Sequence, residues 1–506
     1  MLSPLPASKW NYATAAHLLN RAGFGGTPAE IEKLAAMSPA EAVAYFVDYE
    51  KIPDTSSPPP DWAKPDPNRA EKYQEARRTL TEIEKSAKTE DEKREAGEKR
   101  RQLLQQFQRD LGRELQETRF DWLNRMANGS RPLQEKLTLF WHGHFATSAA
   151  KVRPAYFMWR QIQTFREKAS GNWLDLLEAT AKDPAMLIWL DQAQSRQAHP
   201  NENFARECME LFTLGEGHYT EKDVTEAARA LTGWSLDRQT EAFVYRPRIH
   251  DDGVKTVLGK TGNLDGQDVL ETIVAQPQAA RFITGKLWKF FASDSPDEKL
   301  IDALAENFRA GGNNFAPFLR TLFNCEEFYA EAVMHSQIKS PVQWLVNSVR
   351  LLQRDLPPSL VATQMTASLG QNLLYPPNVK GWDGGLSWIT TNTLLARYNQ
   401  AAILVIGQGN LGAKGDRPGQ QRIADRANEM AGHLRPADIS QIITDDDRHD
   451  QTALIAKLEK RFIQGQLTEK HRQVLRDYLA PHTELNDQTI RHAIRLLMST
   501  PEYQVT

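Results

Sequence analysis

HPNENFARECMELFTLGEGHYTEKDVTEAARALTGW, residues 199–234, places seven acidic residues and two histidines in 36 positions and predicts a pair of short helices. Asn201 can cap the first helix, and Gly215 and Gly217 can end it. Thr220 and Asp223 have the spacing of a capping box for the second helix. Apolar residues recur at helical spacing in both segments, so we expect a helical hairpin with one buried face.

Acidic side chains border the buried face of this predicted hairpin. At about 100° per residue, Asn203, Glu207 and Glu210 form a polar stripe beside the apolar one, and Asp223 flanks the second helix. His218 falls in the turn between the helices. A carboxylate at such a border must pair with a cation, bind a metal ion or shift its pKa. The three acids are therefore candidate catalytic groups, and salt bridges to neighbouring arginines are the alternative.

A second polar cluster follows a predicted helix that begins near Pro132, in RPLQEKLTLFWHGHFATS, residues 131–148. His142 and His144 stand on either side of Gly143 at the end of this helix. His-x-His is a common metal-ligand spacing when the backbone is extended or turning. We interpret both histidines as candidate metal ligands, and buried histidines bonded to backbone carbonyls are the alternative.

The main strand signal lies in AFVYRPRIHDDGVKTVLG, residues 242–259. Aromatic and β-branched residues flank the turn residues Asp252 and Gly253, which predicts a small β-hairpin over about 242–258. Such a hairpin would hold His250, Asp251 and Lys255 close together as a third polar cluster.

A fourth candidate is the loop LYPPNVKGWDGGLSWIT, residues 374–390, which is too apolar for a solvated linker. It must pack on the body of the protein, and Trp382 and Asp383 can line the mouth of a pocket. Tryptophan beside glycine and a carboxylate suits stacking on a sugar ring, and packing alone is the alternative.

Helical periodicity runs through most of the 506 residues and predicts a mostly α, multi-helical fold. We expect one large globular domain over 1–506, with a helical C-terminal segment at 420–506. Residues 69–115 are dense in charges of both signs, which predicts a protruding helical hairpin inserted in the fold.

Composition excludes several classes of protein. A net charge of −3 offers no electrostatic basis for binding nucleic acid. Two cysteines exclude a disulfide framework, and no apolar run is long enough for a membrane span. The first residues lack the charged start and apolar core of a signal peptide, so a cytoplasmic location is expected from the sequence as given.

Five stretches together resemble the bacterial domain-of-unknown-function 1800 family, over about residues 10–505. They are LLNRAGFGGTPAEI, PLQEKLTLFWHGHFATS, NENFARECMELFTLGEGHYTEKDVTEAARALTGW, HDDGVKTVLG and YPPNVKGWDGG. The resemblance implies no activity. Relatives are often exported, which makes a periplasmic or secreted location the alternative. They are also often encoded beside the domain-of-unknown-function 1501 family, whose fold resembles sulfatases and alkaline phosphatases, so a protein of that family is a possible partner.

Two classes of function follow. The first is a hydrolase-type enzyme acting on a glycan or a related polar polymer, by activating water on a divalent metal ion or by paired-carboxylate chemistry. The second is a non-catalytic helical scaffold that acts with a neighbouring enzyme. For the enzyme, the expected pocket gathers all the candidates: catalytic Glu207, Glu210, Asp223, His250 and Asp251, substrate-binding Asn203, Lys255, Trp382 and Asp383, and metal-binding His142, His144 and His218.

Overall fold

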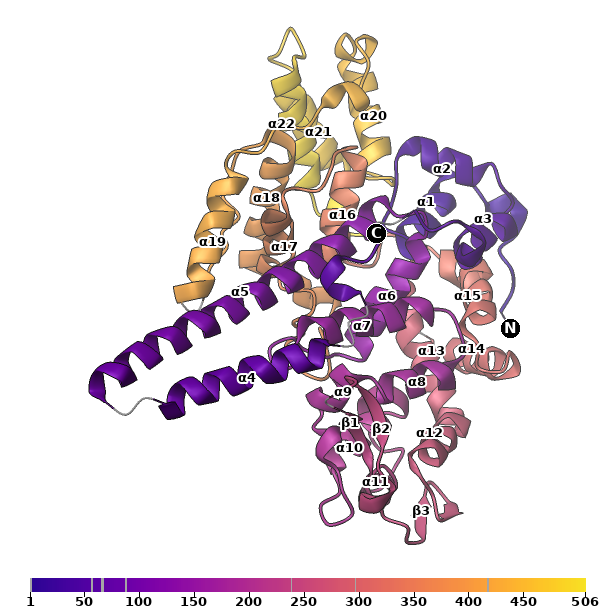
Figure 1. Ribbon diagram of the computed structural model, residues 1–506. Helices are drawn as coiled ribbons and strands as arrows, with labels where there is room; N and C mark the ends of the chain where they lie inside the picture. The colour runs from indigo at the N-terminus through magenta and orange to yellow at the C-terminus, as the bar shows by residue number, and fades with distance from the viewer. Residues whose placement is uncertain are drawn as a thin grey trace.

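The computed structural model describes residues 2–55, 58–64, 68–86, 89–237, 239–295, 297–415 and 418–506. Helices dominate this part of the chain (Figure 1), which confirms the predicted mostly α fold. The first half holds α1 Tyr12–Ala22, α2 Pro28–Ala35, α3 Pro39–Val47, α4 Arg69–Ser86, α5 Glu90–Asn128, α6 Pro132–His144, α7 Ala155–Glu167, α8 Trp173–Ala181, α9 Pro184–Trp189, α10 Glu202–Glu207 and α11 Glu221–Ala230.

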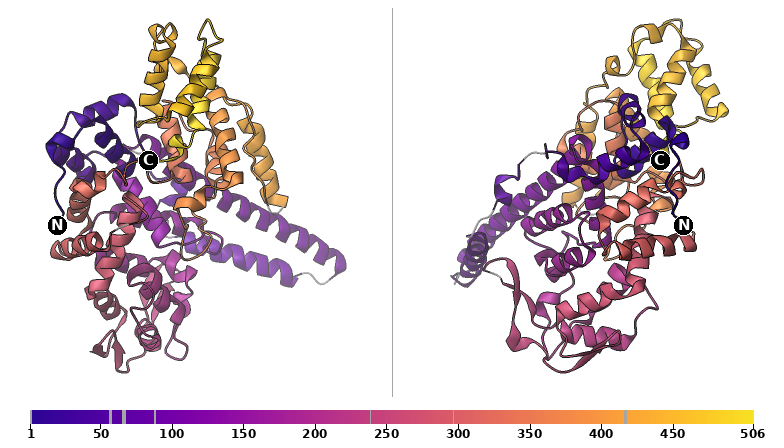
Figure 2. Two further views of the ribbon diagram at one scale, coloured as in Figure 1. Left: turned by 180° about the vertical axis from the view of Figure 1, so that it is seen from behind. Right: turned by 90° about the vertical axis from the view of Figure 1, so that its right-hand side faces the viewer.

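The second half is also helical. It comprises α12 Gly266–Ala275, α13 Pro277–Phe291, α14 Glu298–Ala310, α15 Phe315–Asn324, α16 Pro341–Leu351, α17 Ser359–Ser368, α18 Thr391–Ile406, α19 Pro418–Ala431, α20 Gln451–Phe462, α21 Glu469–Leu479 and α22 Asp487–Met498. Buried apolar side chains from Leu5 to Tyr503 form one connected core. Two views show the helices from α18 to α22 at one end and α8 to α12 with the strands at the other (Figure 2).

The strands pair differently from the predicted hairpin. β2 (Ala242–Tyr245) pairs antiparallel with the preceding strand β1 (Trp234–Asp237), and β3 (Lys255–Val257) pairs with β4 (Lys260–Gly262). The two predicted strand segments therefore belong to separate two-stranded sheets. Leu258 and Gly259, both with positive φ, form the reversal between β3 and β4, and Glu241, also with positive φ, immediately precedes β2. The sequence had predicted a single reversal at 252–253 instead.

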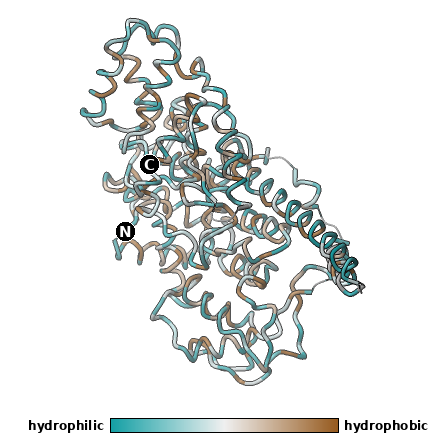
Figure 3. The backbone as a smooth tube through the Cα atoms, turned by 90° about the vertical axis from the view of Figure 1, so that its left-hand side faces the viewer, coloured by the Kyte–Doolittle hydropathy of each residue, from teal (hydrophilic) through white to brown (hydrophobic). Residues whose placement is uncertain are grey.

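The charged segment does form a protruding helical hairpin of α4 and α5, and hydrophilic colour dominates it in Figure 3. Its second helix extends beyond residue 115 to Asn128, because Leu115, Trp122 and Met126 are buried in the core. Polar contacts fix its base: Gln116 donates to Thr363 Oγ1 at 2.7 Å, and the Arg69 guanidinium lies 3.7 Å from the centre of the Tyr156 ring.

Among the buried lysine and arginine side chains of the described residues, four share one bonding pattern: Arg21, Lys136, Lys339 and Arg397. Each donates to backbone carbonyls, for example Lys136 Nζ to Gly23 O at 2.8 Å, and none forms an ion pair with a carboxylate in the described residues. Burial lowers the pKa of Lys339 to about 7 and that of Lys136 far below its usual range. These lysines therefore act in the core as hydrogen-bond donors more than as charges.

The outer part of the hairpin is expected to be dispensable for folding. Replacing residues 72–105 with a short Gly-Ser linker should change the free energy of unfolding by less than about 1 kcal/mol, because this part buries little apolar area. Trp122→Ala, in the buried part of α5, should instead cost about 3–5 kcal/mol. Urea unfolding of both variants tests this, and loss of the folded state on truncation would contradict it.

Candidate functional site

Helix α10 runs directly into a π-helical segment, Cys208–Thr213. Its wider turn is marked by the bond from Leu214 N–H to Met209 O at 2.7 Å. Side chains from elsewhere bond the carbonyls at the end of this segment. Lys286 Nζ donates to Leu211 O at 2.9 Å, and His144 Nε2 lies 3.0 Å from Phe212 O. The π segment is thus held from outside by α6 and α13.

His144 is buried and makes two hydrogen bonds. Because Nε2 faces a carbonyl, it carries the proton, and Nδ1 accepts from Lys286 Nζ at 3.4 Å. The ring stacks on Phe140 with 5.7 Å between centroids. Burial, and then the Lys286 charge, hold the pKa of His144 well below its usual range. His144 is therefore a neutral structural donor, as the alternative reading of the sequence allows.

His142 is also fully buried. Its Nε2 accepts from Leu374 N–H at 3.1 Å, so the proton lies on Nδ1, which has no hydrogen-bond partner among the described residues. Trp122 and Trp382 pack against the ring, with centroids 5.4 Å and 5.6 Å away. Burial lowers the pKa of His142 to about 3.

The loop that carries Trp382 packs on the end of α6. Gly381 has a φ of +86°, and a Cβ there would lie 2.2 Å from Gly143 O, so only glycine permits this approach. Asp383 is exposed and pairs with Lys380 at 3.4 Å. Burial and the charges of Lys380 and Lys289 lower the pKa of Lys286 to about 8. The sequence analysis missed Lys286, because a lysine at the edge of an amphipathic helix is unremarkable there.

A different network surrounds Arg229 on α11. Its guanidinium binds both carboxylate oxygens of Asp251, at 2.8 and 3.0 Å, and both of Glu226, at 3.0 Å. Glu226 also accepts from Thr256 N–H at 3.2 Å. The Arg229 hydrogen bonds lower the pKa of Asp251. Asp251 is thus a paired carboxylate that joins α11 to the segment before β3.

The remaining predicted residues near this network also bond locally. Asp223 forms the capping box of α11 with Thr220 and accepts a hydrogen bond from Leu258 N–H at 2.7 Å. Burial raises the pKa of Asp223, but its hydrogen bonds lower the pKa by more. His250 Nδ1 lies 2.8 Å from Thr232 O. Lys255 is buried, which lowers its pKa, and its Nζ lies 3.4 Å from Asn263 Oδ1.

Two predicted acids lie along the α10 and π segments. Glu210 accepts from the Tyr219 hydroxyl at 2.7 Å. Glu207 is half-buried and forms no hydrogen bond or ion pair in the described residues; burial and the Glu210 charge raise its pKa. Asn203 and His218 are exposed.

Ten of the twelve predicted residues therefore fall into three groups, and Asn203 and His218 belong to none. The groups are His142, His144, Trp382 and Asp383 at the end of α6; Asp223, His250, Asp251 and Lys255 around Arg229; and Glu207 and Glu210 beside Tyr219. No hydrogen bond or ion pair links one group to another within the described residues. The three histidines predicted as ligands are not brought together, and no set of three His, Cys, Asp or Glu side chains in the described chain can hold a metal ion.

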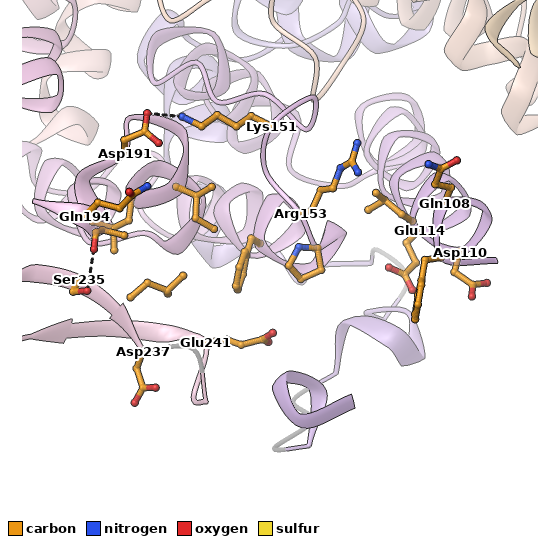
Figure 4. Close-up of a pocket in the computed structure, with 18 of the residues that line it drawn as sticks. Gln108, Asp110, Glu114, Lys151, Arg153, Asp191, Gln194, Ser235, Asp237 and Glu241 are labelled. Carbon is orange, nitrogen blue, oxygen red and sulfur yellow. Dashed lines mark hydrogen bonds and ion pairs between the residues drawn. The ribbon is translucent and has the colours of Figure 1, made fainter. Parts of the chain in front are cut away.

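A large cavity lies elsewhere, between the α4–α5 hairpin and the β1–β2 sheet (Figure 4). It is a cleft of about 1260 Å³. Apolar side chains from α4, α5, α7 and α9 line it, with charged groups around them. The lining comprises Leu80, Leu104, Phe107, Gln108, Asp110, Leu111, Glu114, Lys151, Arg153, Pro154, Phe157, Leu187, Ile188, Asp191, Ala193, Gln194, Ser235, Leu236, Asp237, Glu241 and Arg246.

None of the predicted site residues lines this cleft. One sequence signal for it exists: Leu104, Phe107 and Leu111 recur at helical spacing within the charged segment. The stripe is too sparse to predict a core face, and the other wall comes from segments distant in sequence.

The family model described as protein of unknown function (DUF1800) matches residues 17–505, so the chain belongs to that family. No curated protein and no solved structure matches it. In the described residues, no helix is both long and apolar enough to cross a membrane.

His142 is expected to contribute to acid sensitivity. Its folded pKa of about 3 lies below its usual value, so between about pH 6.5 and pH 3 the unfolded chain binds a proton that the folded chain does not. Stability from this residue is present above that range and is lost as the pH falls through it. The His142→Gln variant should lose less unfolding free energy between pH 7 and pH 4 than the wild type does. Urea titrations at both pH values measure this, and an equal loss in the two proteins would contradict it.

Proposed function

We propose that this protein is a non-catalytic binding protein that holds a segment of a partner polypeptide in the cleft beneath the α4–α5 hairpin. The observation that carries the proposal is the cleft itself. Its volume of about 1260 Å³ exceeds the roughly 300–1,000 Å³ of typical small-molecule pockets. Its walls come from a protruding helical hairpin and from the body of the protein, so an elongated ligand can lie between them.

The chemistry of the cleft favours an amphipathic peptide. Leu104 on α5 is 39% exposed, although it is a large apolar residue, and Phe107 and Leu111 continue the same helix face. Exposed leucines beside charged groups are typical of grooves that receive the apolar side of a partner helix.

Charged groups in the cleft favour a partner with charges of both signs. Glu114 on α5 is half-buried, which raises its pKa, and it forms no ion pair in the described residues. Arg153, drawn between Lys151 and Glu114 in Figure 4, is exposed and forms no ion pair in the described residues either. A partner segment that offers a cation to Glu114 and an anion to Arg153 would neutralise both.

A glycan fits this cleft less well. Flat stacking on a sugar ring uses exposed Trp or Tyr faces, and among the described lining residues there is neither. Trp382, which suggested a glycan in the sequence, lies against His142 instead. Because relatives are often encoded beside members of the domain-of-unknown-function 1501 family, the resemblance suggests a protein of that family as partner, and we retain it as the candidate occupant.

Leu104→Glu is expected to weaken binding of a protein of that family about tenfold or more, because it places a charge on the apolar wall. Leu395→Glu is the matched control, since Leu395 is 60% exposed on α18 and does not line the cleft. Isothermal titration calorimetry with the purified partner measures both. Equal affinities of the two variants would contradict binding in the cleft, and absence of binding by the wild type would contradict the choice of partner.

A hydrolase is the second candidate, favoured by Glu207. A carboxyl group of raised pKa, next to a second carboxylate and free of hydrogen bonds in the described residues, suits general acid catalysis. Glu210, held by Tyr219, would supply the charged member of the pair.

The Glu207→Gln variant tests the catalytic role of Glu207 and the effect of its charge on stability separately. For catalysis, it should abolish release of reducing ends from the polysaccharides that wild type cleaves, and no cleavage by wild type of a broad panel would contradict the hydrolase. Because the folded pKa of Glu207 is raised, its ionisation destabilises the fold as the pH rises through and above the usual Glu range. The variant should therefore melt at a higher temperature than wild type at pH 7 and at a similar one near pH 3, and scanning calorimetry measures this.

A further inference from the structure

Helix α5 contains two glycines, Gly97 and Gly112, within its 39 residues. A Cβ at either position would meet no atom within 4 Å, so neither glycine is there to let another element approach. Glycine weakens a helix relative to alanine and is one of the residues at which helices bend. Both positions therefore make α5 easier to bend without serving its packing.

Gly112 lies where α5 leaves the body of the protein. No residue of α5 from 90 to 111 is buried, whereas Leu115, three residues after the glycine, is 2% exposed. Beyond the glycine, polar contacts also fix the helix, as when Arg119 donates to Asn372 Oδ1 at 2.8 Å. A bend at Gly112 therefore moves the outer part of α5 and leaves the buried part in place.

The other helix of the hairpin, α4, is held to the body at its first residue. The Arg69 guanidinium lies 3.7 Å from the centre of the Tyr156 ring, and its Nη1 lies 3.9 Å from Glu241 Oε2. These contacts are at one end of α4, and the rest of the helix runs along α5 (Figure 1). The two helices can therefore turn together, with Arg69 as the pivot of α4.

The surface that a bend would move faces an apolar wall. Leu104 on α5 lines the same cleft as Leu187 and Ile188 on α9 and Leu236 on β1. Apolar surfaces that face each other across water are stabilised when they meet. A bend of about 30° at Gly112 would carry Leu104, about 12 Å further along the helix, through about 6 Å.

We propose that the outer part of the hairpin is an autoinhibitory lid that bends at Gly112 and closes over the empty cleft. The structure described above is the open form. In the closed form the apolar face of the hairpin lies on α9 and β1 and blocks the site. A partner segment binds only the open form, so the closed fraction lowers its apparent affinity. This competition rests on the proposed function, whereas the bending of α5 does not.

The distance between two spin labels tests the lid in the absence of any partner. Glu98→Cys on the outer part of α5 and Gln239→Cys between β1 and β2 place the labels at exposed positions. The native Cys208 and Cys325 are buried. We expect double electron–electron resonance to show the open distance and a second population shorter by about 10 Å, because Glu98 lies about 21 Å from Gly112 along the helix.

Two glycine variants locate the bend. Gly112→Ala should lower the ratio of the short to the open population about threefold or more, since alanine favours the straight helix. Gly97→Ala is the matched control, because Gly97 is an equally open glycine of α5 that lies beyond the label. A single population at the open distance, or an equal effect of the two variants, would overturn the proposal.

Addition of a partner separates the lid from the proposed function. With a saturating protein of the domain-of-unknown-function 1501 family, the short distance should disappear. Gly112→Ala should also bind that protein more tightly than the wild type, by about twofold or more. Persistence of the short distance in the complex would overturn the lid as a competitor. Absence of any binding would contradict the proposed partner alone, and the label distances in the free protein would still decide the lid.

Discussion

Two carbonyl groups of the π-helical segment Cys208–Thr213 set the arrangement of much of the molecule. Their partners are His144 at the end of α6 and Lys286 on α13, so three elements distant in sequence meet at one turn. The loop around Gly381 then packs on Gly143 and places Trp382 over His142. A buried carbonyl without a partner costs about 1–3 kcal/mol, which makes these side chains a condition of the fold.

The need to bond buried carbonyls also accounts for cations in the interior. Arg21 and Lys136 donate to carbonyls just after the ends of α13 and α1, and Lys286 to one near the end of the π segment. Lys339 donates to Tyr503 O and Arg397 to Lys339 O. Helix ends leave backbone oxygens unpaired, and a long side chain can reach them through the core. Burial of a full charge is expensive, and the lowered pKa of the lysines reduces that cost.

The sequence was sufficient for the features that depend on local pattern. The capping box predicted at Thr220 lies where α11 begins, and the charged hairpin follows from its composition. The strand partners could not be read, because β1 at 234–237 follows a helix and its pairing is decided by packing. The sequence predicted the histidines and acids as site residues, with carbonyl-bonded histidines and salt-bridged acids as the alternatives. Their partners, Arg229, Lys286 and Phe212 O, were fixed only by the tertiary fold.

The cleft also could not be predicted from the sequence. Leu104 and Phe107 on the hairpin face a wall made by α7, α9 and the β1–β2 sheet, and each segment alone carries too few apolar residues to predict a site.

The central claim is that a partner polypeptide occupies this cleft. Hydrogen–deuterium exchange with and without the proposed partner, a protein of the domain-of-unknown-function 1501 family, tests it most directly. The account predicts slowed exchange in residues 104–114, 151–157 and 234–246 with little change around Arg229, whereas protection confined to other surfaces would contradict it.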